Sequence, residues 1–289
     1  MSFWIVTDGC CDLPESYISR QKQITIVPLT YQVDGVSYES SLDETKLLHL
    51  YDLMREGGTS TTAQINESTW KDYLTIPLEA GHDVLCVVFS SGLSGTFDAS
   101  RQAVETLKVK YPERSLATVD TLAASLGEGL LVDAALRCRD ERGMSLEQTR
   151  DWLEENKLRV AQWFTVEDLR YLRRGGRVSA ASAIIAGALK IKPVLHVDNE
   201  GKLISMDKVQ GRKRSLRAVV SHIRSSAVNI EEQTIFISHG DCQDDAFRVA
   251  DLIKEEFPVK DVLISMVGPI IGTHSGPGTI AVFWFANER

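Results

Sequence analysis

The sequence predicts an α/β protein of two domains, a first with a parallel sheet between helices and a second with a mixed sheet. Over residues 1–158, short apolar runs alternate with helical patterns, the order that produces parallel strands joined by helices. Over residues 159–289, a hairpin pattern and more closely spaced strands replace this alternation. A chain of 289 residues is long enough for both domains.

The elements of residues 1–158 follow from two periodicities. Runs of apolar and β-branched residues predict strands, and apolar residues recurring every three to four positions predict helices. The expected strands are residues 3–7, 24–29, 83–89 and 115–119, with two further strands across 31–38 that turn at Asp34-Gly35. The expected helices are residues 15–22, 44–55, 70–80, 96–111, 122–142 and 145–156.

Residues 159–289 contain the same signals in a different order. The expected strands are residues 161–166, 194–197, 202–206, 234–238, 262–266 and 280–285. The expected helices are residues 180–189, 216–226 and 244–256. Asn199-Glu200-Gly201 predicts the turn of a hairpin. The segment 180–189, AASAIIAGAL, has no charge on any side and is expected to be a helix buried all round.

Composition excludes several classes of protein. A net charge of −8 argues against a nucleic-acid-binding protein. No apolar run approaches the roughly 20 residues that span a bilayer, so we expect no integral membrane segment. The N-terminus has the pattern of a strand and not of a signal peptide, and we expect a cytoplasmic protein. Five cysteines without Cys-x-x-Cys, and six histidines without metal-ligand spacing, indicate no metal site.

One loop has the features of an anion site. In VVFSSGLSGTFDAS, residues 87–100, an apolar strand leads through a Gly/Ser loop into a helix. Free backbone N–H groups and the positive end of the helix dipole favour an anion there. The loop lacks the lysine of a phosphate-binding P-loop. Ser91 follows the carboxyl end of the strand, where open α/β sheets bind their ligands.

Three other loops hold unusual residues. In TDGCCDLP, residues 7–14, Asp12 precedes a proline at a helix start, which favours the interpretation of a helix cap. GGTSTTAQIN, residues 57–66, is rich in hydroxyls, a weak signal by itself because caps and turns use the same residues. In GTHSGPGT, residues 272–279, three glycines and a proline fix the backbone around His274, which makes it a candidate functional histidine.

A hydrolytic triad is one combination of these loops. Ser91 or Ser94 would be the nucleophile, His274 the base, and Asp8 or Asp12 the group that orients it. The Gly-x-Ser-x-Gly elbow that exposes a nucleophilic serine is missing, which argues against this combination.

Two basic clusters stand out on this acidic chain. They offer an acidic partner or a phosphate group a binding surface, or else they are solvated faces. The first contains Arg170, Arg173, Arg174 and Arg177, and the second contains Lys208, Arg212, Lys213, Arg214 and Arg217.

Taken together, the motifs TDGCCDLP, TAQIN, SSGLSGTFDAS, DTLAASLG, LRYLRRGGRVS, ALKIKPVLHVDNEGKL and IGTHSGPGT resemble those of the DegV family of bacterial fatty-acid-binding proteins. The resemblance covers essentially the whole chain. It implies a two-domain, DegV-like fold with one long-chain fatty acid buried between the domains. It also implies a lipid-binding subunit that is not itself an enzyme and needs no cofactor. Such a subunit presents the acyl carboxyl group to a fatty acid kinase, which makes acyl phosphate for phospholipid synthesis.

The resemblance also implies site residues. Its carboxylate-binding threonine falls on Thr62, with Thr61 as the alternative register, its loop serine on Ser91, and its histidine on His274. A carboxylate with its tail in an apolar tunnel must keep its hydrogen bonds, and hydroxyl donors supply them. For the tunnel wall we expect the helix 180–189, with Ile184, Ile185 and Ala188, although an ordinary core helix would have the same sequence.

Contacts to the kinase or to phosphate are expected from Arg177, which matches the family's Gly-Gly-Arg, and from Lys208 and Arg212. The family often has Lys-x-Arg-Gly in the second basic cluster, and Gln210 here replaces the arginine. A lipid sensor or store without a kinase partner is therefore an alternative. Another is an enzyme acting on a small substrate through His274, because the fold also resembles the substrate-binding subunit of dihydroxyacetone kinases.

Elsewhere the chain departs from the family's pattern in two loops. Gly9 replaces the serine of Thr-Asp-Ser, and Ala63 and Ile65 replace the serine and proline of Thr-Ser-Gln-Pro. Lipid binding tolerates these changes more easily than binding of a partner does.

Overall fold

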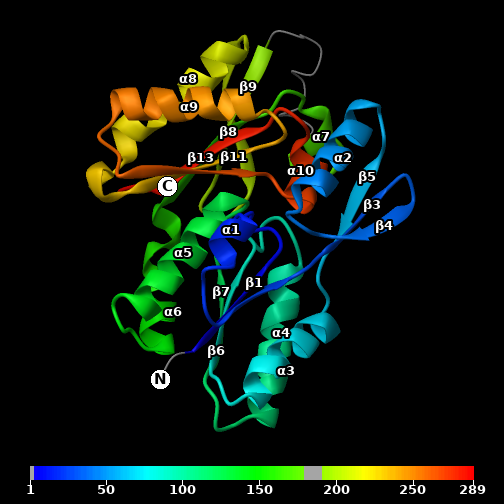
Figure 1. The fold of residues 1–289 in the computed structure, drawn as a ribbon, viewed down its shortest axis with the longest axis vertical. Helices are drawn as coiled ribbons and strands as arrows, with labels where there is room; N and C mark the ends of the chain where they lie inside the picture. The colour runs from blue at the N-terminus through cyan, green and yellow to red at the C-terminus, as the bar shows by residue number, and fades with distance from the viewer. Residues whose placement is uncertain (1–2, 179–190) are drawn as a thin grey trace.

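The computed structural model describes residues 3–178 and 191–289 and contains three sheets (Figure 1). The first part of the chain forms a four-stranded parallel sheet, and the second part forms a six-stranded mixed sheet. The predicted fold class, α/β with a parallel sheet and a mixed sheet, is confirmed. The expected helix 180–189, and with it Ile184, Ile185 and Ala188, lies outside the described residues.

The parallel sheet has the strand order β2-β1-β6-β7, with α3 and α4 on one face and α5 and α6 on the other. Because both faces are covered, β6 is buried along its whole length, as its uninterrupted apolar sequence predicts. The strands are β1 (Trp4–Asp8), β2 (Ile24–Val27), β6 (Val84–Val88) and β7 (Leu116–Asp120). The helices are α1 (Glu15–Ile18), α3 (Glu67–Glu79), α4 (Thr96–Lys110), α5 (Leu126–Asp140) and α6 (Leu146–Asn156).

The mixed sheet has the order β10-β9-β8-β13-β11-β12, in which only β11 and β12 are parallel neighbours. Helices α8 and α9 cover its outer face. The strands are β8 (Val160–Thr165), β9 (Ile191–Val197), β10 (Leu203–Gln210), β11 (Thr234–His239), β12 (Asp261–Met266) and β13 (Ile280–Phe285). The helical segments are α8 (Arg212–Ser226), α9 (Gln243–Glu256), η1 (Lys157–Arg159) and η3 (Ile230–Glu232).

Helix α5 joins the two sheets. It packs on β1 and β6 with one side and on β8, β11 and β13 with another, so nearly all of its residues are buried. Gly127 and Gly129 allow this close approach, since a Cβ there would lie 2.5 Å from Gln162 Oε1 and 2.6 Å from the Cys11 carbonyl oxygen. The inner face of the mixed sheet therefore faces the carboxyl ends of the parallel strands, where a ligand site is expected.

A small antiparallel sheet reaches from the first part of the chain onto the second. Its strands are β4 (Val36–Glu39), β3 (Thr30–Val33) and β5 (Ser60–Ala63), and α2 (Glu44–Arg55) packs beside them. These elements contact α10 (Pro269–Ser275), which in turn packs on α7 (Arg170–Arg174), as Figure 1 shows. The hydroxyl of Tyr51 in α2 donates to the Val267 carbonyl oxygen at 2.8 Å.

Three elements, β5, α7 and α10, lie where loops or turns were expected. Other elements differ in their bounds: the helix expected at residues 122–142 begins at Leu126, and the helix expected at 15–22 ends at Ile18. The division of the chain at residues 158/159 stays a prediction, although the six-stranded sheet is built entirely from residues after it. No helix within the described residues has the length and apolar character needed to cross a membrane.

Candidate functional site

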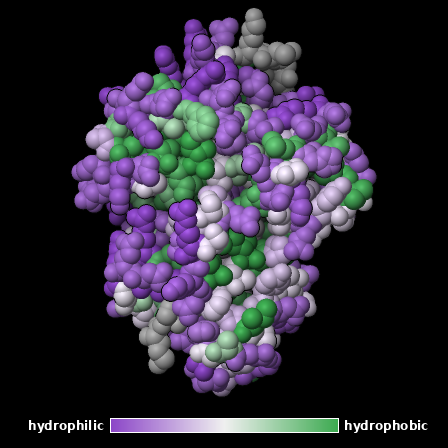
Figure 2. All heavy atoms as spheres, in the orientation of Figure 1, coloured by the Kyte–Doolittle hydropathy of each residue, from purple (hydrophilic) through white to green (hydrophobic). Residues whose placement is uncertain are grey.

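A cavity of about 590 Å³ lies between the parallel and the mixed sheet, a size usual for small-molecule sites. Its wall is largely apolar and comes from both parts of the chain. It includes Leu29, Phe89 and Leu93 from the first part and Phe164, Leu172, Val197, Leu203, Ile270 and Phe283 from the second. On the face drawn in Figure 2, hydrophobic side chains reach the surface in the middle of the molecule, where the two parts meet.

The alternation of side chains along the strands explains the apolar wall. Phe164, Phe283 and Ala281 point to the inner face of the mixed sheet, while Trp284 and Val282, one residue away, pack under α8 and α9. The inner face is only partly covered by α5, and the remaining space is the cavity. An apolar wall of this kind suits the hydrocarbon part of a ligand.

The polar end of the cavity contains Thr62 and His274. Thr62 lies on β5 and His274 in the last turn of α10, 212 residues away, and their Oγ1 and Nε2 atoms are 2.8 Å apart. The expectation that His274 sits in a Gly/Pro loop was wrong, because α10 continues to Ser275 and the loop begins at Gly276. The two predicted residues are brought together.

His274 is neutral at physiological pH. Burial lowers its pKa to about 4, and the cationic Arg177 and Arg174 lower it in the same direction. Its Nδ1 is buried and has no hydrogen-bond partner among the described residues. Because an orphaned N–H is rarer than an orphaned acceptor, and cations lie nearby, the proton belongs on Nε2. Nε2–H then donates to Thr62, whose own hydroxyl proton is free for a ligand.

The Gly/Ser loop contributes Ser94 to the cavity wall, not Ser91. Ser94 accepts a hydrogen bond from the N–H of Thr96 at 3.2 Å, which fixes it at the start of α4. Ser91 is exposed, and its N–H donates to Asp120 Oδ1 at 3.1 Å. Gly95 permits the loop to approach Gln64, the residue after β5, since a Cβ there would lie 3.1 Å from the side-chain Cδ of Gln64.

Of the predicted basic residues, Arg177 alone borders the cavity. Its guanidinium donates to the carbonyl oxygens of Leu93, at 3.3 Å, and Gly175, and burial lowers its pKa. Lys208 is exposed on β10, outside the residues that line the cavity.

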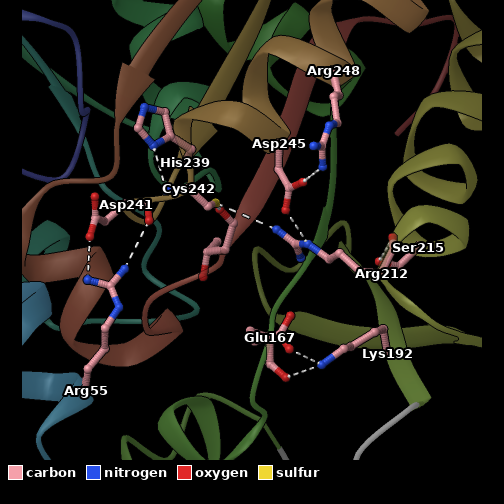
Figure 3. A network of polar contacts seen from close by, with 11 residues as sticks. Arg55, Glu167, Lys192, Arg212, Ser215, His239, Asp241, Cys242, Asp245 and Arg248 are labelled. Atoms are coloured by element: carbon pink, nitrogen blue, oxygen red, sulfur yellow. Dashed lines mark hydrogen bonds and ion pairs between the residues drawn. The ribbon is translucent and has the colours of Figure 1, made fainter.

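Arg212 belongs to a separate polar network (Figure 3). Its Nε donates to Asp245 at 2.8 Å, and its Nη2 lies 3.7 Å from the sulfur of Cys242. Asp245 also bonds Arg248, and nearby Lys192 pairs with Glu167. Asp245 is therefore shared between two guanidinium groups, and Nη1 of Arg212 is buried without a hydrogen-bond partner among the described residues.

Asp8 and Asp12 are both buried. Asp8 accepts the N–H groups of Cys10 at 2.9 Å and Phe89 at 3.0 Å, and burial raises its pKa. Asp12 does not cap α1, contrary to the expectation: the residue before α1 is Pro14, with no side-chain cap. Neither carboxylate has a hydrogen bond to His274 among the contacts of the described residues, so a triad through His274 is not assembled.

Metal ligands do not gather within residues 3–178 and 191–289, where no group of three or more His, Cys, Asp and Glu side chains has a suitable arrangement. The polar end of the cavity instead offers hydroxyl groups and a neutral imidazole. Hydroxyl groups can donate hydrogen bonds to a carboxylate, and the imidazole, whose N–H donates to Thr62, orients one of them.

Residues 2–287 match the family model described as "Uncharacterised protein, DegV family". A DegV domain-containing protein of Clostridium perfringens is 40% identical over 288 residues, which cover 99% of this chain and 98% of that protein. A DegV lipid-binding protein of Thermotoga maritima has a similar crystal structure, with a TM-score of 0.88, 27% identity and full coverage of both chains. The structure of a fatty-acid-binding DegV family protein of Thermus thermophilus has a TM-score of 0.88 and 28% identity to this chain, and the match covers 99% of this chain and all of that one.

Proposed function

The chain belongs to the DegV family, and from this membership we propose that it binds one long-chain fatty acid in the cavity between its two parts. The observation that carries the proposal is the Thr62–His274 pair at the polar end of a largely apolar cavity of about 590 Å³. Similar proteins of Thermotoga maritima and Thermus thermophilus are described as lipid-binding and fatty-acid-binding, respectively. The bound fatty acid is the only ligand that we propose, without a cofactor.

The carboxylate would accept hydrogen bonds from the hydroxyls of Thr62 and Ser94, with His274 behind Thr62. These donors meet the requirement that a buried carboxylate keep its hydrogen bonds. Ser94 takes the role that the sequence assigned to Ser91, because Ser94 lines the cavity and Ser91 is exposed. The acyl tail would lie along the apolar wall that contains Phe164 and Phe283.

We further propose that the protein has no turnover of its own and presents the carboxyl group to an ATP-dependent fatty acid kinase in the cytoplasm. Support comes from the absence of an acid–base partner for His274 among its described contacts. Arg177 at the cavity and exposed Lys208 would meet the kinase or the phosphate that it transfers. Arg212 is a weaker candidate, since Asp245 already holds its guanidinium.

Mass spectrometry of a solvent extract from the purified, gel-filtered protein tests lipid binding directly. We expect a fatty acid at about one per chain. An extract without fatty acid from a folded sample would contradict the proposal, and hydrolysis of an acyl ester or conversion of a triose by the protein alone would favour the enzyme alternative.

A pair of serine variants tests the head-group assignment. Ser94→Ala removes a donor at the cavity and should lower the amount of retained lipid, as should Thr62→Ala. Ser91→Ala is the matched control from the same loop and should retain lipid like the parent, because Ser91 is exposed. If Ser91→Ala retained less lipid than Ser94→Ala, the assignment would be overturned.

A further inference from the structure

Asp12 makes contacts that capping and lipid binding leave unexplained. The residue is 1% exposed and lies between β1 and α1. Its Oδ1 accepts the N–H of Gly268 at 2.9 Å, and its Oδ2 accepts the hydroxyl of Ser125 at 2.5 Å. Gly268 is the residue before α10, 256 positions away, so this carboxylate connects distant parts of the chain.

The first contact fixes the start of the helix that carries His274. Helix α10 has seven residues, about 10 Å in length, so a shift of its first turn moves its last turn as well. A Cβ on Gly268 would lie 2.5 Å from Asp12 Oδ1, so only glycine allows the observed approach. Since Thr62 is held by pairing of β5 with β3, the 2.8 Å distance between Thr62 and His274 depends on where α10 begins.

The second contact leads to the cavity wall. Ser125 Oγ lies 3.0 Å from Ser238 Oγ on β11, and both serines line the cavity. Asp12 and Ser125 have φ angles of 51° and 55°, and at Ser125 ψ is −142°, a conformation rare outside glycine. Such backbone strain persists only where surrounding contacts maintain it, and it concentrates at functional sites.

From these contacts we propose that Asp12 is a positioning residue for the ligand site. It holds the start of α10 and the Ser125–Ser238 wall so that His274 meets Thr62. The inference rests on the proposed fatty acid binding and adds to it a residue that does not touch the ligand. Without the carboxylate, the N–H of Gly268 has no acceptor, α10 shifts, and the polar end of the cavity loses its geometry.

Three variants test the proposal. Asp12→Ala removes both contacts, whereas Asp12→Asn keeps an acceptor for Gly268 and a polar partner for Ser125. Asp133→Asn is the matched control, because Asp133 is another buried carboxylate of the first part of the chain, and its side-chain contacts among the described residues are with Tyr17 and Arg137. Each protein is delipidated and titrated with the fluorescent fatty acid cis-parinaric acid. Nitrogen NMR of 15N-labelled histidine, assigned with His274→Gln, reports on the ring of His274 without ligand.

We expect Asp12→Ala to weaken binding about tenfold or more and to shift the Nε2 signal of His274. Asp12→Asn should have an affinity and a His274 signal close to those of the parent. Asp133→Asn should change neither the affinity nor the His274 signal, even if it lowers the melting temperature. Parent-like affinity and an unmoved His274 signal in Asp12→Ala would overturn the proposal, as would an equal change in Asp133→Asn.

Two further comparisons keep the test decisive. If Asp12→Ala does not fold, Gly268→Ala breaks the same hydrogen bond from the other side with a backbone conformation that alanine adopts (φ −66°, ψ 170°). It should shift the His274 signal, and an unmoved signal would overturn the proposal. If the parent itself does not bind cis-parinaric acid, lipid binding fails, while the His274 signals of the ligand-free proteins still decide the role of Asp12.

Discussion

Replacing Gly175 with alanine is expected to disrupt ligand binding, because the added Cβ atom collides with the ring of His274. Gly175 follows α7 with φ −72° and ψ −8°, a conformation that alanine adopts without strain. A Cβ there would overlap Nδ1 of His274 and lie 3.0 Å and 3.1 Å from its Cε1 and Cγ atoms. The imidazole has to rotate away, which breaks its hydrogen bond with Thr62.

The magnitude follows from these contacts. Overpacking of this kind costs about 1–3 kcal/mol. The lost hydrogen bond adds about 1 kcal/mol. If at least half of this cost falls on the bound state, the affinity for a fatty acid drops about tenfold to a hundredfold. Titration of the delipidated protein with a fluorescent fatty acid measures the change.

Gly176→Ala is the control for this experiment. At Gly176 φ is 69°, yet a Cβ there would have no heavy atom within 4 Å. This substitution should cost stability of about 1–2 kcal/mol through left-handed strain and leave the affinity unchanged. Parent-like binding by Gly175→Ala, or an equal loss in Gly176→Ala, would refute the reasoning that His274 must keep its place.

Three other predictions follow from single side chains. Arg289→Ala removes a guanidinium that donates to four backbone carbonyl oxygens from both parts of the chain, so unfolding in urea should show a loss of about 3 kcal/mol; a loss below about 1 kcal/mol would contradict this. Burial raises the pKa of Asp12 from 3.8 to about 7, so the folded state binds a proton that the unfolded state has already released. This proton contributes fully to stability below pH 3.8, and the contribution is lost as the pH rises through about 7. Asp12→Asn should therefore lose less stability than the parent between pH 4 and pH 7.5, and equal slopes of the urea midpoint against pH would exclude this assignment. Lys208→Glu, at an exposed position outside the cavity, should weaken binding of an acidic kinase surface at low salt and leave lipid content unchanged; unchanged kinase binding would remove Lys208 from the contact.

The elements that sequence predicts well are those fixed by local signals. Helix α2 has the expected bounds, residues 44–55, because Asp43 caps it by accepting the N–H of Lys46 at 3.0 Å and one apolar stripe faces the core. Strand β5 depends on pairing with β3, so the hydroxyl-rich segment that contains it looked like a loop. Helix α10 did carry a signal, Pro269 as its first residue after Gly268, followed by two isoleucines.

The head-group assignment shows the same limit at the level of side chains. Thr62 and His274 were predicted from motifs, and the structure adds only that they meet. For the loop serine, the motif SSGLSGT offers three candidates, and the turn decides among them. The N–H groups of Leu93 and Ser94 both donate to the Ser90 carbonyl oxygen. This turn places Ser94 on the cavity wall and leaves Ser91 exposed at the surface. Orientation in a turn is a three-dimensional property that spacing in a sequence does not encode.

The electrostatics of the polar end have a consequence for how a ligand would leave. Among the described residues that line the cavity, Arg177 is the single formal charge, and its guanidinium already donates to the carbonyl oxygens of Leu93 and Gly175. A carboxylate would therefore accept its hydrogen bonds from neutral hydroxyl donors, backed by a histidine that burial and the nearby arginines keep uncharged, while Arg177 would act on it only through its charge. Charge-assisted pairs are roughly twice as strong as neutral hydrogen bonds. A site with neutral donors retains a lipid mainly through the apolar tail, and it leaves the carboxylate free to exchange its partners for those of another protein.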